Sequence, residues 1–107
     1  MAYIIADNII SPLGETSEEN YLSVKAGRSG IRAYEPGTCN IPEGFYASLL
    51  FEDFETLALK SAQKAIANGR LELKGKRTAF ILSSTKGNIE ENISLADSAQ
   101  RIATQLG

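Results

Sequence analysis

The sequence contains no histidine and no tryptophan, and Cys39 is its only cysteine. Histidine is the commonest general base and metal ligand, so neither a Ser-His nor a Cys-His catalytic pair can be assembled from this chain alone. A lone cysteine excludes an internal disulfide, which is typical of a reducing compartment. Cysteines and carboxylates nowhere show the spacing of a metal site. We therefore expect no metal and no catalytic residue within these 107 residues.

An excess of one charge and long apolar runs are also lacking. The 11 basic and 13 acidic residues leave a formal net charge of −2, which creates no field to attract nucleic acid or an anionic membrane. The start, MAYIIADN, has no basic residues ahead of its apolar ones, so we expect no signal peptide. No apolar run approaches the length of a membrane span. These features predict a cytoplasmic protein without nucleic-acid or membrane partners.

Apolar residues make up 43% of the chain and charged residues 22%, the composition of a globular protein with one modest core. Two nearly continuous apolar runs, residues 3–10 and residues 78–84, predict strands covered on both faces, as in a parallel sheet. Residues 45–51 fit a strand, and they also fit an apolar lead-in to the next helix. Of these two interpretations we favour the strand.

A first helix is predicted directly after the turn SPLG. The sequence TSEE places Thr16 and Glu19 as a capping box, and Gly27 supplies the C-terminal stop. The buried side of this helix is predicted to consist of Tyr21, Leu22, Val24 and Ala26.

Two further helices follow. Asp53 is a good N-cap for a helix over residues 54–68, which Gly69 ends, and its alanines with Ser61 form a smooth stripe for close packing. Asn88 is placed to cap a third helix, with Glu91 completing a box-like pattern and apolar stripes on two sides. The alternation of strands and helices predicts an α/β fold, with a mainly parallel or mixed sheet and packed helices, in a single domain over residues 1–107.

The most distinct local site candidate is SSTKGNIEEN, residues 83–92, where a predicted strand passes through a loop into a helix N-terminus. Ser84, Thr85, Lys86 and Gly87 are its candidate residues, because strand ends and helix N-termini favour anionic groups. The order of residues is not that of a P-loop, and a well-capped connection explains the same pattern. Cys39 lies in a loop with no base or cation beside it, so we do not expect a nucleophile there.

Two segments near the start of the chain together resemble the N-terminus of β-ketoacyl synthases, the condensing enzymes of fatty-acid and polyketide synthesis. They are ISPLG, residues 10–14, and VKAGRSGI, residues 24–31. That family characteristically begins with a short hydrophobic strand, a [ST]-P-[LV]-G turn, and a helix that ends in L-x-A-G-x-S-G-I. The residues matched to these structural motifs are Ser11, Pro12, Leu13, Gly14, Ala26, Gly27, Ser29, Gly30 and Ile31.

The resemblance continues less closely along the chain. An alanine-rich helix ending in ANG, residues 67–69, and the strand TAFILSS match the family in order and character. The family's glycine-rich run after that strand is replaced here by STKGN, in which only Gly87 is a counterpart, so the chain resembles a divergent member. The resemblance spans nearly all of these residues but only a minor part of a synthase.

The resemblance implies a partial thiolase-like fold, the N-terminal portion of a synthase's N-terminal domain. The parent would catalyse a decarboxylative Claisen condensation of substrates carried on the phosphopantetheine of acyl carrier protein, with no other cofactor. Its cysteine nucleophile and both histidines would follow Gly107, and Cys39 comes far too early to be that nucleophile. The chain alone would then be inactive and would self-associate, as a homodimer for example, through apolar surface along residues 89–106. Two alternatives are a non-catalytic partner subunit and a small anion-binding module that uses residues 83–88.

Overall fold

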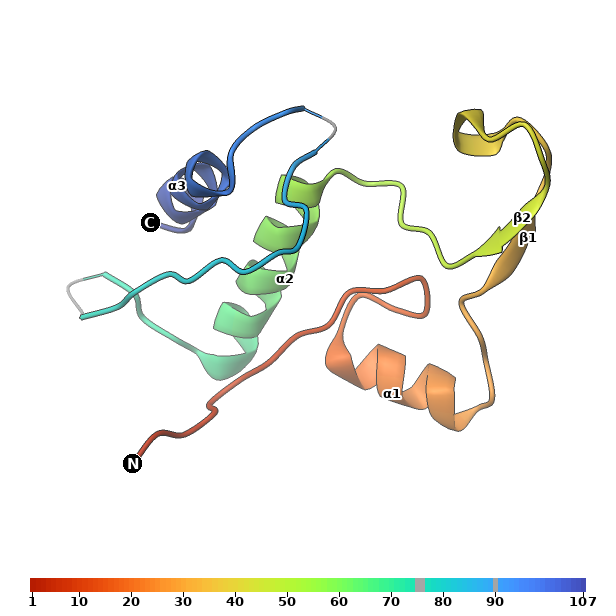
Figure 1. Cartoon of the computed structure of the whole chain (residues 1–107). Coiled ribbons are helices and arrows are strands. Elements are labelled where there is room, and N and C mark those ends of the chain that lie inside the picture. The colour runs from red at the N-terminus through yellow and green to blue at the C-terminus, as the bar shows by residue number, and fades with distance from the viewer. Residues whose placement is uncertain (75–76, 90) are drawn as a thin grey trace. The chain divides into compact units, whose positions relative to one another are not determined.

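A computed structural model describes residues 1–74, 77–89 and 91–107. Within these residues the chain is a small α/β protein with three α-helices and a two-stranded sheet, shown in Figure 1. It divides into two compact units, Ile9–Phe51, called here the α1 unit, and Met1–Asn8 with Glu52–Gly107, called the α2–α3 unit. In chain order the elements are α1 (Ser17–Lys25), β1 (Arg32–Tyr34), the 3₁₀ turn η1 (Thr38–Asn40), β2 (Phe45–Ala47), α2 (Phe54–Gly69) and α3 (Leu95–Leu106).

Helix α1 begins and ends as its sequence predicts. Thr16 is the N-cap: its Oγ1 accepts a hydrogen bond from the Glu19 amide at 3.1 Å, while its hydroxyl donates to the Glu19 carboxylate. At the other end Gly27 takes a φ of +80°, and the amides of Gly27 and Arg28 donate to the carbonyls of Val24 and Ser23. This paired pattern is the Schellman motif, which the absence of a Cβ at Gly27 permits.

The predicted buried side of α1 is wrong. Asn20 and Ser23 are the buried residues of this helix, whereas the apolar set predicted to be buried, Tyr21, Leu22, Val24 and Ala26, is exposed. The turn at residues 11–14 contacts the polar face because its carbonyls need donors, which apolar side chains do not have.

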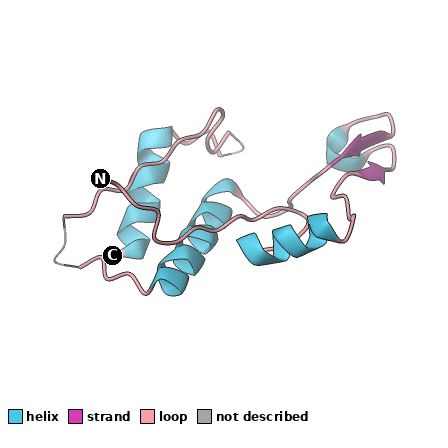
Figure 2. Cartoon of the chain, turned by 90° about the horizontal axis from the view of Figure 1, so that it is seen from below, coloured by secondary structure: helices cyan, strands magenta, loops and turns pink. Residues whose placement is uncertain are grey.

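Strands β1 and β2 form an antiparallel pair, visible in Figure 2, with Ala33 opposite Tyr46 and Tyr34 opposite Phe45. The Tyr34 and Phe45 rings stack at 5.3 Å between centroids, and Phe51 meets Tyr34 edge-on. The sequence favours a strand for residues 45–51, and the first three of these residues form β2. The expectation of a mainly parallel sheet is wrong for the described residues, because the sheet they form is antiparallel.

The two runs expected to form a parallel sheet have no strand partner. Residues 3–10 and 78–84 contain no strand and are drawn as loops in Figure 2. Within the first run Tyr3, Ile4 and Ile5 are 78%, 89% and 72% exposed, and in the second Ile81 is 85% exposed. A strand forms only where another strand takes up its backbone donors and acceptors, so apolar sequence alone did not produce one here.

Helix α2 follows its predicted bounds to within one residue, starting after the N-cap Asp53 and including Gly69. Residues 6–8, which are loop and not the expected sheet or helix, contact it at Ser61 and near its C-terminal end. The Asn8 amide donates to Ser61 Oγ at 2.9 Å, and a Cβ at Gly69 would lie 2.9 Å from the Ala6 Cβ. The N-terminal run therefore lies along α2 within this unit.

Helix α3 starts later than the sequence predicts. Its N-cap is Ser94, whose Oγ accepts from the Asp97 amide at 3.1 Å, and Asn88 instead pairs with Ile93 in an isolated bridge. Glu90 of the predicted helix start lies outside the described residues. Ile102, 2% exposed, is the buried hydrophobic residue of the described chain and lies on α3. The small core explains why packing does not extend the helix back to Asn88.

Candidate functional site

The four residues of the predicted anion loop do lie together in one tight turn. Ser84 Oγ accepts hydrogen bonds from the Gly87 amide at 2.8 Å and from the Lys86 amide at 3.3 Å, and Gly87 has a φ of +59°. Thr85 and Lys86 are exposed. The amides that an anion would use are thus already bonded to the Ser84 hydroxyl.

The helix N-terminus expected to support this loop lies elsewhere. Helix α3 begins at Leu95, several residues beyond Gly87, so its free amides and dipole are not contiguous with the loop. Anion binding at residues 84–87 therefore stays a prediction that depends on the side chains of Thr85 and Lys86.

A charged cluster that sequence reasoning missed follows the loop. Asn88 is 2% exposed, and its Nδ2 donates to Glu55 Oε2 at 3.1 Å and to Glu91 Oε2 at 3.2 Å. Arg101 Nη2 lies 3.3 Å from the same Glu55 oxygen, and its Nη1 lies 4.0 Å from the Glu91 carboxylate. The cluster joins the loop to α2 and α3 and so has a structural explanation. The Asn88–Glu91 spacing was visible in the sequence, but nothing there marked Glu55 or Arg101 as its partners.

The ISPLG motif forms a closed turn in the α1 unit. The backbones of Ser11 and Gly14 exchange hydrogen bonds of 2.9 Å and 3.1 Å, and Ser11 Oγ accepts from the Leu13 amide. A Cβ at Gly14 would lie 2.6 Å from the Glu19 Cβ, a distance that real Cβ atoms essentially never show. Glycine is required here because the turn passes directly over the first turn of α1.

Asn20 holds this turn against the helix. Its Nδ2 donates to the carbonyls of Ile9 at 2.9 Å, Gly14 at 3.2 Å and Thr16 at 2.7 Å, and its Oδ1 accepts from the Ser11 hydroxyl. Ser23, one helical turn on, donates from its hydroxyl to the Leu13 carbonyl at 2.9 Å. We call these bonds the Asn20–Ser23 contacts. Sequence reasoning missed both residues, because α1 is polar along most of its length and no local signal distinguishes Asn20 and Ser23 from its other polar residues.

The AGRSGI motif carries the chain out of α1 and back over the turn. Ser29 Oγ accepts from the Ile31 amide at 3.2 Å. A Cβ at Gly30 would lie 2.9 Å from Ser48 Oγ, which can rotate away, and 3.2 Å from the Pro12 Cβ, so a larger residue would require a small shift of the turn. Ala26 and Ile31, the other matched residues, are exposed. The turn lies against α1 and the exit segment lies against the turn, and this backbone path explains the glycines of both motifs.

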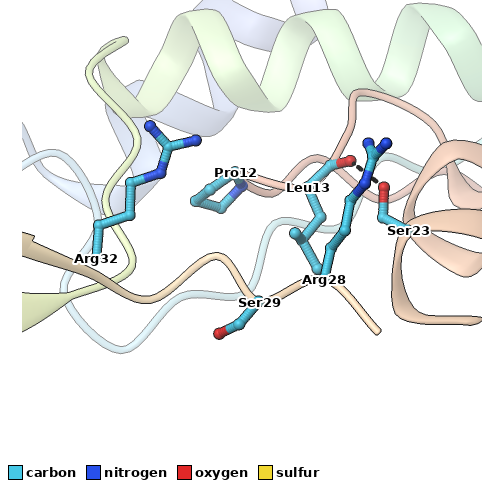
Figure 3. Close-up of a pocket in the computed structure, with 6 residues that line it drawn as sticks. All are labelled: Pro12, Leu13, Ser23, Arg28, Ser29 and Arg32. Atoms are coloured by element: carbon cyan, nitrogen blue, oxygen red, sulfur yellow. Dashed lines mark hydrogen bonds between the residues drawn. The ribbon is translucent and has the colours of Figure 1, made fainter. Parts of the chain in front are cut away.

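A pocket lies where the turn and this exit segment meet, as Figure 3 shows. It has a volume of about 420 Å³ and is lined by Pro12, Leu13, Ser23, Arg28, Ser29 and Arg32. The two arginine side chains extend on either side of Pro12. Neither arginine was singled out from the sequence, because charged residues that follow a helix are usually exposed to solvent and have no binding role.

Two further side chains, Cys39 and Asp53, bear on the sequence predictions. Cys39 is a free, exposed thiol at a φ of +54°. The Thr56 amide, with the Thr56 hydroxyl as a further donor, lowers the pKa of Asp53, which is the effect of an N-cap. The described residues contain no group of cysteine and carboxylate side chains that could hold a metal ion. None of the helices they form has the length and apolar character needed to cross a membrane.

Comparisons with protein-family models, with curated proteins and with solved structures found no match to this chain.

Proposed function

We propose that the chain is the N-terminal part of a β-ketoacyl-acyl-carrier-protein synthase, in which it supplies scaffold rather than chemistry. The observation that carries the proposal is the role of the motif glycines. A Cβ at Gly14 would clash with the Glu19 Cβ, a Cβ at Gly30 would lie close to the Pro12 Cβ, and Gly27 has a positive φ. The SPLG and AGxSGI motifs thus encode one specific backbone path. Agreement with the family in both motifs therefore argues against a chance match to its N-terminal segment.

The unpaired apolar runs support the idea that more chain completes this fold. Residues 3–5 and Ile81 expose large apolar side chains in extended segments, which is the character of central strands that lack their sheet. An apolar groove of about 880 Å³, open to solvent, lies between α2, α3 and the segment that contains Phe80. Exposed apolar surface of this kind favours burial, so we infer that further structure covers it.

In the complete protein, residues 3–10 and 78–84 would be strands of the thiolase-like sheet. The condensation itself would be carried out by the cysteine and histidines of the family, which this chain lacks. Acyl carrier protein would be the partner of the complete enzyme, in the cytoplasm. The isolated chain would self-associate through its exposed apolar surface.

An antibody against this chain tests the proposal in the source cells. We expect it to precipitate a polypeptide several-fold heavier than 11.5 kDa. The precipitate should catalyse the condensation of acyl- and malonyl-carrier protein, and iodoacetamide should block this activity. The purified 107-residue chain should show no turnover in the same assay. Measurable turnover by that chain would contradict the proposal.

A polypeptide of 11.5 kDa in the precipitate would overturn the proposal in one of two ways. If a separate catalytic synthase chain and its activity come down with it, the protein is a non-catalytic partner subunit. If neither does, the synthase assignment fails and anion binding at residues 83–88 becomes the hypothesis to test.

A further inference from the structure

The pocket beside the Pro12–Leu13 turn combines two cations with a small apolar surface. The exit segment contributes Arg28 and Arg32 to its lining, and the turn contributes Pro12 and Leu13. No carboxylate lines the pocket, and neither arginine forms an ion pair within the described parts of the chain. Both side chains are exposed, so their guanidinium groups are accessible to a ligand.

The polar atoms of the turn are already satisfied. The Leu13 carbonyl accepts from Ser23 Oγ, and the Leu13 amide donates to Ser11 Oγ. The groups left for a ligand therefore include the donor groups of the two arginines and the Ser29 hydroxyl, together with the apolar surfaces of Pro12 and Leu13 (Figure 3). This combination selects a ligand that has an anionic end and an apolar part.

The backbone that carries the arginines is held in place at several points. Arg28 follows Gly27 in the Schellman motif, and its amide is bonded to the Ser23 carbonyl at 3.0 Å. Arg32 is the first residue of β1, where it pairs with Ala47. Gly30, between them, lies close to Pro12, where a Cβ would be 3.2 Å from the Pro12 Cβ. A site on a fixed backbone loses less conformational entropy when a ligand binds.

We propose that this pocket binds a phosphate monoester, with the phosphate held by Arg28 and Arg32 and the organic group lying on Pro12 and Leu13. Each guanidinium group can donate two parallel hydrogen bonds to a pair of phosphate oxygens. A carboxylate has only two oxygens and accepts such a pair from one arginine, whereas a phosphate monoester has enough oxygens for both arginines. The volume of about 420 Å³ exceeds what a lone phosphate ion needs and lies within the range of small-molecule pockets, roughly 300–1,000 Å³. The site does not depend on the synthase proposal, because it is formed wholly by residues 12–32.

Titration of the ¹⁵N-labelled chain with inorganic phosphate, phenyl phosphate and glutarate tests this site. We expect saturable shifts of the backbone amides of residues 13 and 28–32, with phenyl phosphate binding more tightly than inorganic phosphate and glutarate binding most weakly. Arg28→Gln and Arg32→Gln should each weaken phenyl phosphate binding about tenfold, and the double variant should abolish it. Arg70→Gln, which removes an exposed arginine from the α2–α3 unit, is the matched control and should leave binding unchanged.

The remaining outcomes count against the proposal. Equal affinity for phenyl phosphate and inorganic phosphate would overturn the assignment of an organic phosphate. Tighter binding of glutarate would overturn the phosphate class. Absence of saturable shifts, or equal binding by the double variant and Arg70→Gln, would overturn the site itself. Retained amide dispersion in each variant's spectrum establishes that the α1 unit is still folded.

Discussion

Truncation of Asn20 to alanine should destabilise the α1 unit by an amount that follows from its hydrogen bonds. Of the three carbonyls that its Nδ2 contacts, Gly14 keeps a backbone donor in the Ser11 amide and Thr16 keeps one in the Asn20 amide. The Ile9 carbonyl loses the partner that the structure gives it, and the Ser11 hydroxyl loses the acceptor for its proton while its oxygen keeps the Leu13 amide as a donor. One part-buried carbonyl and one hydroxyl proton left without a partner, at about 1–2 kcal/mol each, give a loss of about 2–4 kcal/mol.

Urea unfolding followed by far-UV circular dichroism measures this loss, and hydrogen exchange at the Leu13 and Gly14 amides localises it to the turn. Asn68→Ala is the matched control, because Asn68 is an exposed asparagine on α2. It should change the free energy of unfolding by no more than about 0.5 kcal/mol. If Asn20→Ala costs no more than Asn68→Ala, the Asn20–Ser23 contacts do not hold the turn.

Asn20→Asp separates shape from hydrogen bonding at the same position. The new side chain keeps the size of asparagine, but its carboxylate has no donor and faces three carbonyl oxygens. Those oxygens raise its pKa in the folded chain above the unfolded value, so the unfolded chain binds fewer protons between the two values. Stability should therefore increase as pH falls through the raised pKa. A loss that is independent of pH would refute this explanation of the contacts.

Three further predictions concern the turn, the α2 cap and the 83–88 loop. Gly14→Ala should cost about 1–3 kcal/mol in urea unfolding, because its Cβ would lie 2.6 Å from that of Glu19; Gly44→Ala, whose Cβ meets nothing closer than 3.4 Å, is the control, and equal losses would contradict the clash. The lowered pKa of Asp53 means that its capping contribution is fully present above the unfolded pKa and is lost as pH falls through the folded pKa. Helix content measured by circular dichroism should follow this acid titration, and Asp53→Asn should remove it; an unchanged acid profile in that variant would exclude Asp53 as the group. If residues 84–87 bind an anion, calorimetry should detect phosphate binding that Lys86→Ala abolishes while Arg28→Gln preserves it; no binding heat from that loop would end the anion-module hypothesis.

Helix boundaries were the features most accessible to prediction. The caps Thr16 and Asp53 and the stop at Gly27 act through hydrogen bonds and backbone angles within a few residues of the chain. The cap at Asn88 failed because its side chain is used over a distance of 33 residues, by Glu55. Local signals thus predict an element correctly until a distant partner competes for the same side chain.

The strands and the sheet depended on contacts that no local pattern specifies. Residues 78–84 have the composition of a buried strand, yet a strand requires a second chain segment to bond with, and none pairs with them in the described structure. Antiparallel pairing at β1 and β2 arises where a connecting loop brings nearby segments together. The predicted strands at residues 3–10 and 78–84 are therefore wrong for the described structure, because composition does not supply the second segment that a strand needs.

The candidate sites divide in the same way. Spacing along the chain determined the caps of α1 and α2 and the glycine-bearing motifs, and composition excluded histidine chemistry from these residues, because these depend on residue identity and on neighbours within a turn or two. Tertiary structure alone decided that α1 buries Asn20 and Ser23 in place of its apolar residues, and that Arg28 and Arg32 line one pocket with Pro12. The physical reason is that the partly buried carbonyl groups of the turn need hydrogen-bond donors. Which side chains lie close enough to donate to them depends on how the turn packs against the helix.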